Sequence, residues 1–263
     1  MSPVRRMVAA AAALVIGGVA ATVLIAASFA PAEADGLMNA FDTCETPSVQ
    51  QMATWYTASP YKAVGIYIGG ASRACPNEAL NTPGWVNTVR AQGWRILPVY
   101  VGPQAPCTRF TVPMTDNPLG DGIWAADDAV THALTAGLHP GDPIYVDIEA
   151  YNGDDACNNA VRAFLHGWTD ELHVRGFRSG LYGNYNSAIA AETGAAWRGD
   201  PPVDSIWFAW WTGTPQLNGV PGLPETSWNQ HQRVHQWAGD HKETWGGVTM
   251  EIDSNLVDGL TAS

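Results

Sequence analysis

Short apolar and β-branched runs recur along the chain, and most of them are separated by enough residues for a helix. Runs of this length predict buried strands, and helices between successive strands predict right-handed β–α–β units. Eight runs qualify as strands, which is the number that closes a barrel. They cover residues 38–41, 63–68, 95–101, 144–148, 178–182, 205–210, 233–237 and 249–252.

The segments after the first four strands carry helix start and stop residues. Ser48 is a capping residue for the first of them, and Thr82 with Pro83 opens the second. The glycines at positions 93, 137 and 176 end the second, third and fourth. The predicted helices therefore cover residues 48–57, 82–93, 123–136 and 157–175.

The last third of the chain has a different pattern. Residues 212–232 are rich in Gly, Pro and Asn, and residues 239–248 are too few for a crossover helix, so that they predict a hairpin-type loop. We therefore predict an α/β fold: an irregular TIM-type (β/α)8 barrel with helices missing from its last third.

The N-terminal segment predicts export. Arg5 and Arg6 precede a long apolar stretch over residues 7–30, and Ala32-Glu33-Ala34 offers a small-x-small cleavage site. We assign residues 1–34 to a signal peptide and residues 35–263 to one barrel domain, which is then secreted, extracellular or associated with the cell wall. The alternative is an uncleaved N-terminal anchor, because the stretch is nearly long enough to span a bilayer.

Charge and composition narrow the range of partners. The formal net charge of -12 argues against nucleic acid and against anionic lipid, since both bind through clustered Lys and Arg. The 12 Trp and 8 Tyr favour carbohydrate only slightly, because large aromatic side chains also fill protein cores.

All four cysteines follow the leader, and an even number in an exported chain predicts two disulfides. Each cysteine lies after a different one of the first four strands, and consecutive barrel strands are neighbours. Since a disulfide needs Cα atoms within roughly 7 Å, we expect Cys44 to pair with Cys75 and Cys107 to pair with Cys157.

The candidate chemistry centres on residues 144–149, a strand-like run that ends in two acids. Asp147 and Glu149 are two positions apart and therefore share one face of the strand. Asp42 follows the first strand and Asp253 the last, so four carboxylates are expected at one barrel mouth, where barrel enzymes keep their active sites. One acidic strand end alone would be explained by solvation. Side chains expected to bind substrate at this mouth are Tyr67, Tyr100, Tyr182, Trp210, Gln236 and Trp237.

Trp210 and Trp211 are adjacent, so only one of them can face the barrel interior. Alternation places Phe208 on the face of Trp210 and Trp207 on the face of Trp211. Both faces carry a large aromatic side chain, and the pattern does not decide which face points inward. We predict that Trp210 lines the cleft.

Together these segments resemble the exported bacterial glycoside-hydrolase-like domain of unknown function 1906, a family similar to glycoside hydrolase family 25, the muramidase-type lysozymes. The resemblance extends over residues 37–259. It is carried by Phe41-Asp42-Thr43-Cys44, Gly65-Ile66-Tyr67-Ile68-Gly69-Gly70, Leu97-Pro98-Val99-Tyr100-Val101-Gly102, Tyr145-Val146-Asp147-Ile148-Glu149 and Ile252-Asp253-Ser254-Asn255.

The resemblance implies cleavage of peptidoglycan, or a related polysaccharide, after N-acetylmuramic acid. It gives Glu149 the role of general acid and Asp147 the role of partner that orients the substrate N-acetyl group, with Asp42 and Asp253 as the acidic floor. Repulsion among neighbouring carboxylates supports an acid that keeps its proton near neutral pH. Neither a cofactor nor a metal ion is implied.

Two other functions fit the same residues. A non-catalytic carbohydrate-binding module of the cell wall would grip glycan at the same mouth without cleaving it. A metal-dependent hydrolase would use the carboxylates as ligands for Ca²⁺ or Mg²⁺.

Overall fold

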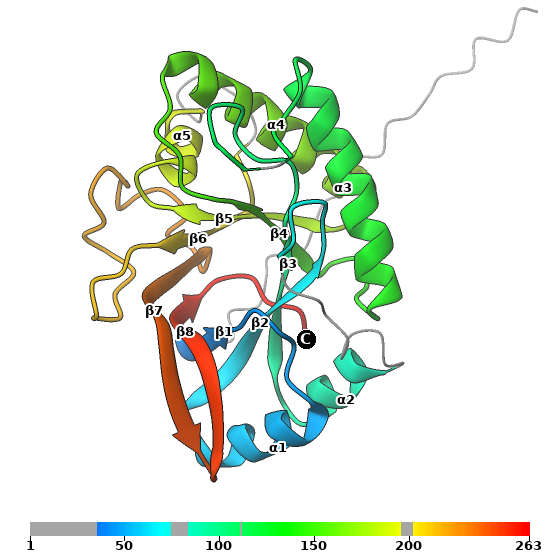
Figure 1. Cartoon of the computed structure of the whole chain (residues 1–263), viewed down its shortest axis with the longest axis vertical. Coiled ribbons are helices and arrows are strands. Elements are labelled where there is room, and N and C mark those ends of the chain that lie inside the picture. The colour runs from blue at the N-terminus through cyan, green and yellow to red at the C-terminus, as the bar shows by residue number, and fades with distance from the viewer. Residues whose placement is uncertain (1–35, 75–83, 111, 196–201) are drawn as a thin grey trace, which may run out of the picture.

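The computed structural model describes residues 36–263 apart from 75–83, 111 and 196–201 (Figure 1). Its strands close into a barrel in chain order, which confirms the predicted TIM-type architecture. The strands are β1 (Met38–Asp42), β2 (Tyr61–Gly69), β3 (Arg95–Tyr100), β4 (Pro143–Ile148), β5 (Arg178–Asn184), β6 (Ser205–Ala209), β7 (Arg233–Trp245) and β8 (Val248–Asp258).

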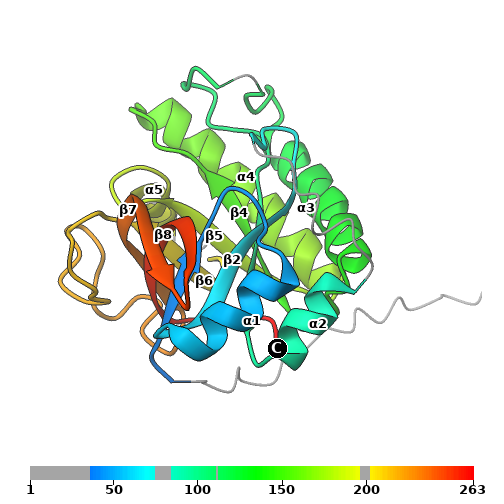
Figure 2. The same cartoon turned by 60° about the horizontal axis from the view of Figure 1, so that its bottom comes forward.

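The barrel departs from a regular (β/α)8 barrel at its last strand. Strands β1 to β7 run parallel, whereas β8 is antiparallel to both β7 and β1. Residues 239–248, expected as a hairpin-type loop, are mostly strand: β7 and β8 continue beyond the barrel and meet at Gly246 and Gly247. Both glycines have positive φ, as the tight two-residue hairpin turn requires. The long hairpin stands beside α1 in Figures 1 and 2.

Five helices lie in the described part of the chain: α1 (Val49–Ala58), α2 (Trp85–Ala91), α3 (Pro118–Thr135), α4 (Asp155–Val174) and α5 (Ala188–Ala195). Ser48 caps α1 as expected, and its side chain and that of Gln51 form a capping box. The predicted start of α3 was five residues too late, because Asn117 caps the helix and a proline occupies its first position. The predicted opening of α2 at Thr82 and Pro83 lies outside the described residues.

Helices cover only part of the barrel. Figure 1 shows α3 and α4 lying side by side on one side of the barrel, where α3 contacts β2 and α4 contacts β5. The two helices approach closely at Gly122 of α3, where an added Cβ would lie 2.1 Å from the carbonyl oxygen of Phe164 on α4. The sequence pattern missed α5, between β5 and β6, while the connection from β6 to β7 contains no described helix, as expected. None of the described helices has the length and apolarity needed to cross a membrane.

The barrel interior is filled by one small apolar layer, to which every strand except β5 contributes a buried side chain, while β5 adds the partly buried Tyr182. Tyr145 and Trp207 supply its largest rings, which meet edge to face with centroids 5.8 Å apart. Glycines on other strands make room for them: a Cβ on Gly180 would lie 2.3 Å from the Tyr145 ring, and one on Gly65 would lie 2.6 Å from the Trp207 ring. The layer also contains Ala40, Ala63, Leu97, Val99, Val234 and Val257.

This packing predicts that Gly65→Ala destabilises the barrel. The added methyl would overlap both the Trp207 ring and Cβ of Asp42, so we expect the free energy of unfolding to fall by about 1–3 kcal/mol. Thermal and urea denaturation measure the loss. The double variant Gly65→Ala/Trp207→Phe should lose less than the sum of the two single variants, because the smaller ring leaves room for the methyl. Strict additivity would contradict this account.

Candidate active site at the barrel mouth

The polar floor of the mouth continues the alternation of the apolar layer. Asp42 comes two residues after Ala40 on β1, and Gln236 comes two residues after Val234 on β7, so both point into the barrel above the apolar layer. Asp147 repeats the pattern on β4. All three polar side chains are at most 4% exposed. The same period that builds the core thus places buried polar groups directly above it.

Asp42 is held by two side-chain amides. Nδ2 of Asn255 donates to its Oδ2 at 2.7 Å, and Nε2 of Gln236 donates to Oδ2 and Oδ1 at 3.1 and 3.3 Å. Each amide is oriented in turn by an indole: Nε1 of Trp207 donates to Asn255 at 2.7 Å, and Nε1 of Trp211 donates to Gln236 at 2.9 Å. These bonds fix both amides with their N–H groups toward the carboxylate.

The position of Asp253 corrects the sequence interpretation. It was expected at the end of the last strand, but β8 is antiparallel and Asp253 lies in its middle, directly across from Asp42 in the β1–β8 register. It reaches the mouth because the hairpin extends beyond the barrel. Gln236 donates to its Oδ2 at 3.1 Å, and the backbone N–H of Asp240 donates to its Oδ1 at 2.6 Å.

Burial and mutual repulsion raise the pKa of the acids of this floor. Burial raises the pKa of Asp42 to about 8, and the charge of Asp253 adds to the rise, while the Asn255 and Gln236 amides oppose it. Burial also raises the pKa of Asp253, against the Asp240 N–H bond. A raised pKa means that these carboxyls hold protons at pH values where free aspartates are ionised.

Asp147 and Glu149 lie across the mouth from this pair, at the end of β4. Burial raises the pKa of Asp147 well above its ordinary value, and Glu149 and Asp42 add repulsion. Its Oδ1 is buried, and no residue in the described part of the chain forms a hydrogen bond with it. The Glu149 side chain is solvent-accessible, but the concave mouth removes part of its hydration and raises its pKa, an effect that the Ala150 backbone N–H opposes. An accessible acid with a raised pKa can donate a proton near neutral pH.

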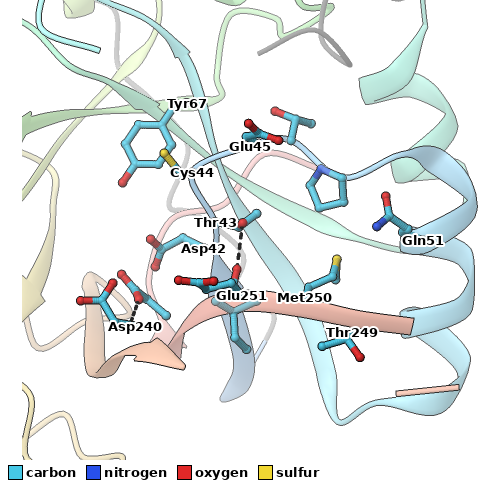
Figure 3. A pocket seen from close by; sticks show the side chains of 14 residues that line it. Asp42, Thr43, Cys44, Glu45, Gln51, Tyr67, Asp240, Thr249, Met250 and Glu251 are labelled. Carbon is cyan, nitrogen blue, oxygen red and sulfur yellow. Dashed lines mark hydrogen bonds between the residues drawn. The ribbon is translucent and has the colours of Figure 1, made fainter. Parts of the chain in front are cut away.

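Three hollows surround these acids. The hairpin groove, about 530 Å³, lies between the start of α1 and the β7–β8 hairpin, and its lining includes Asp42, Tyr67, Glu251 and Asp253 (Figure 3). Among the lining residues, Oγ1 of Thr43 donates to the carbonyl oxygen of Glu251 at 3.0 Å, which joins the end of β1 to β8. The groove therefore runs outward from the acidic floor along the hairpin.

The other two hollows share Glu149. The loop hollow, about 200 Å³, is bordered by Tyr67, Gln104, Asp147 and Glu149. The aromatic hollow, about 310 Å³, lies on the other side of Glu149, and its lining is completed by Ile148, Ala150, Tyr182, Asn184, Tyr185, Ala209, Trp210, Trp211 and Gln236. Because Tyr67 also borders the hairpin groove, the three hollows adjoin one another around the mouth, with Glu149 between two of them.

The structure brings some of the expected binding residues to this mouth. Tyr67 borders two hollows, and the Tyr182 hydroxyl donates to Oε1 of Gln236 at 3.1 Å. Burial together with the surrounding acids raises the pKa of both tyrosines. Both hydroxyls therefore stay protonated and can donate hydrogen bonds.

Tyr100 and Trp237 are not brought there. Tyr100 points outward from β3, stacks on Trp168 of α4 and donates its hydroxyl hydrogen to Asp128 of α3 at 2.7 Å. Trp237 follows Gln236 on β7 and borders none of the three hollows. Alternation explains both misplacements, since a neighbour of an inward residue faces outward.

The structure also decides between the two faces of β6. Trp207 points into the barrel and Phe208 outward, where Phe208 stacks on His235. Trp210 packs on the outward side against His235, with ring centroids 5.9 Å apart, and only borders the aromatic hollow. Trp211, which we did not choose, is 57% exposed and is bonded to Gln236.

Close packing fixes the ring of Trp211. A Cβ on Gly239 would lie 2.2 Å from it, so the indole lies against the backbone of β7 at a position where only glycine fits. Its remaining surface faces the aromatic hollow. The sequence signal for this role was the shared face of Trp207 and Trp211.

One predicted disulfide is confirmed. Cys107 and Cys157 are bonded, with Cα atoms 5.9 Å apart, and join the loop after β3 to the first turn of α4. Cys75 lies outside the described residues, so the Cys44–Cys75 bond stays a prediction. No described cysteine is free.

The acids of the mouth are not grouped as metal ligands. Within the described residues, no set of three or more His, Cys, Asp or Glu side chains has an arrangement that could hold a metal ion. Gln236 and Asn255 direct amide N–H groups toward Asp42, and an N–H group does not bind a cation.

Comparison with known proteins follows this geometry. The family model described as Rv2525c-like, glycoside hydrolase-like domain matches residues 53–257. Among curated proteins, none matches the chain.

Solved structures share the fold at low identity. An uncharacterised B. stearothermophilus protein superposes with a TM-score of 0.60 and 20% identity over 85% of this chain and 99% of that one. The Mycobacterium tuberculosis Tat-secreted protein Rv2525c, in complex with L-tartrate, gives 0.53 and 18% over 84% and 95%. The modular autolysin LytC from Streptococcus pneumoniae, in complex with a synthetic peptidoglycan ligand, gives 0.54 and 11% over 84% of this chain and 46% of LytC.

The raised pKa of Asp42 predicts a pH-dependent stability. The folded protein binds a proton that the unfolded chain, with an aspartate pKa of 3.8, has lost, so stability falls as the pH rises from about 4 to about 8. Asp42→Asn removes this titration, so its melting temperature should rise relative to that of the parent across the same window. Melting curves of both proteins at intervals from pH 4 to pH 8 test this. A constant difference between the two would contradict the prediction.

Proposed function

We propose, from the premise that this chain belongs to the Rv2525c-like glycoside hydrolase-like family, that its barrel mouth binds peptidoglycan glycan strands and cleaves them by a muramidase-like reaction. The observation that carries the proposal is the place of Glu149: an accessible carboxyl with a raised pKa, between two hollows and above buried acids. A glycosidic oxygen that crosses from one hollow to the other would lie beside this acid.

The residues of the mouth have separate roles in the proposed reaction. Glu149 donates its proton to the leaving glycosidic oxygen, which needs an acid that is still protonated near neutral pH. Asp147 orients the substrate N-acetyl group, whose acetamide oxygen bonds to the anomeric carbon as the glycosidic C–O bond breaks, and water then opens this intermediate. The unpartnered Oδ1 of Asp147 supports this role, because a buried acceptor without a donor gains from a substrate N–H.

The shape and chemistry of the mouth support a glycan partner. Three adjoining hollows suit an extended polymer better than a small molecule. Trp211 offers an exposed ring of the kind that stacks on sugar faces. LytC, which shares the fold, was crystallised with a peptidoglycan ligand. Rv2525c is Tat-secreted, and we propose that this chain is likewise exported, with residues 1–34 as its signal.

Glu149→Gln tests the reaction. The amide keeps the shape of the side chain but cannot donate the proton, so release of new reducing ends from purified peptidoglycan should fall about 10²- to 10⁴-fold while binding is retained. Glu171→Gln is the matched control, since Glu171 lies on α4 beside Arg175, away from the mouth, and its loss should leave the rate unchanged.

An unchanged rate in Glu149→Gln would exclude Glu149 as the acid. If the parent protein binds peptidoglycan but releases no reducing ends, the non-catalytic binding module is the correct function. Mass analysis of the released muropeptides identifies the cleaved bond.

Trp211 and Trp210 should separate binding from stability. Trp211→Ala removes an exposed ring and should weaken glycan binding by about tenfold, and because the Tyr182 hydroxyl still donates to Oε1 of Gln236, the melting temperature should fall less than in Trp210→Ala. Trp210→Ala removes a ring packed between Tyr185 and His235, so it should lower the melting temperature more than it weakens binding. Pull-down on insoluble peptidoglycan and thermal melts measure the two effects, and the opposite assignment would contradict this placement of the two rings.

A further inference from the structure

The β3–β4 ladder stops before it reaches the two acids of β4. Strand β3 pairs with β4 only as far as Tyr100 opposite Val146. On its other edge β4 is paired with β5 through Asp147 and Ile148. The backbone groups of Asp147 and Glu149 that face β3 therefore have no strand partner. Yet the backbone of this segment sets the direction of the two carboxyl groups.

A side chain takes the place of the missing strand. Nε2 of Gln104 donates to the carbonyl oxygen of Asp147 at 2.9 Å, and Oε1 of Gln104 accepts from the backbone N–H of Glu149 at 2.8 Å. In a parallel ladder one residue of the neighbouring strand bonds a carbonyl and an N–H that are two residues apart, and the Gln104 amide reproduces this pattern. Gln104 is 1% exposed, so water does not compete for either bond.

Gln104 is itself firmly placed. Its backbone N–H donates to the carbonyl of Val112 at 2.8 Å, and its carbonyl accepts from Met114 at 2.7 Å, which closes the loop after β3 on itself. The Cys107–Cys157 disulfide joins that loop to α4, the helix that follows the acids in the chain. The loop and the acids are thus tied together both by the amide and by the disulfide.

We propose that Gln104 is a positioning residue that sets the backbone of Asp147 and Glu149 and so aims the Glu149 carboxyl. Its catalytic consequence rests on the proposed function, whereas its effect on the backbone does not. No other side chain can do the same: a shorter amide would not span the gap, methionine has the length but neither polar group, and ionised glutamate lacks the donor.

Gln104→Met in the full exported chain tests the proposal. Loss of both bonds should lower kcat on peptidoglycan about 10- to 100-fold with KM changed less than about threefold, because misaiming the acid affects the reaction more than binding. Amide hydrogen exchange at Glu149 should accelerate at least tenfold. Gln216→Met is the matched control, since the Gln216 amide donates to the Asn218 carbonyl in the β6–β7 loop, and it should change neither quantity.

Gln104→Glu supplies a second test, which also serves if the methionine variant does not fold. Its carboxyl can donate to the Asp147 carbonyl only when protonated, so its activity relative to the parent should rise as the pH falls, and the exchange of the Glu149 amide should slow in parallel. A residue with a merely structural role would lower stability without this pH signature.

The outcomes distinguish the positioning role of Gln104 from the proposed reaction. If folded Gln104→Met keeps the parent kcat and the parent exchange rate at Glu149, the positioning role is wrong. If the parent protein cleaves nothing, the proposed reaction fails, and exchange at Glu149 alone decides whether Gln104 holds this backbone.

Discussion

The burial of Asp42 is the constraint on which the mouth depends. A carboxyl group removed from water must either bind donors or keep its proton, and here both occur. Asn255 and Gln236 supply N–H groups from β8 and β7, and indoles from the β6 side hold the far ends of these two amides. One buried acid thus links β1 to β7 and β8, so these side-chain bonds lie at the point where the β1–β8 ladder closes the barrel.

The reversed last strand makes this arrangement available. A parallel eighth strand would present only its C-terminal end at the mouth. The antiparallel β8 instead passes along the mouth and places Asp253 across from Asp42, with Asn255 two residues further on the same inward face. The continuation of β7 and β8 beyond the barrel then forms one wall of the hairpin groove. The hairpin that replaces the final crossover helix is therefore the same element that forms one wall of the hairpin groove.

The two pairs of acids have different surroundings. Asp42 and Asp253 are tied to amide and backbone donors, and their raised pKa reflects burial that these donors only partly offset. Asp147 has a buried oxygen without a donor, and its neighbour Glu149 reaches solvent. Close acids in unlike surroundings share protons unequally, and the one that is both accessible and partly dehydrated is suited to give its proton away.

Local patterns in the chain predict the strands, their order, and the acids Asp42, Asp147 and Glu149 at the ends of β1 and β4. Apolar runs of strand length and the spacing of Asp147 and Glu149 depend only on local periodicity, which the chain carries wherever it folds. The motif order also carried the family resemblance, and Cys107 and Cys157 were paired correctly because neighbouring strands bring their loops together. Asn255 could have been recognised from its position two residues after Asp253.

Tertiary structure alone decided the rest. The short connection over residues 239–248 already indicated a hairpin, but the register that places Asp253 opposite Asp42 depends on how the barrel closes. Whether Trp207 or Phe208 points inward depends on which ring the glycines of other strands leave room for. Tyr100 turned outward because its neighbours on β3 already fill the interior. The role of Gln104 has no local sequence signal, since the two β4 backbone groups that its side chain bonds are more than forty residues away and only the folded barrel brings them within hydrogen-bond reach.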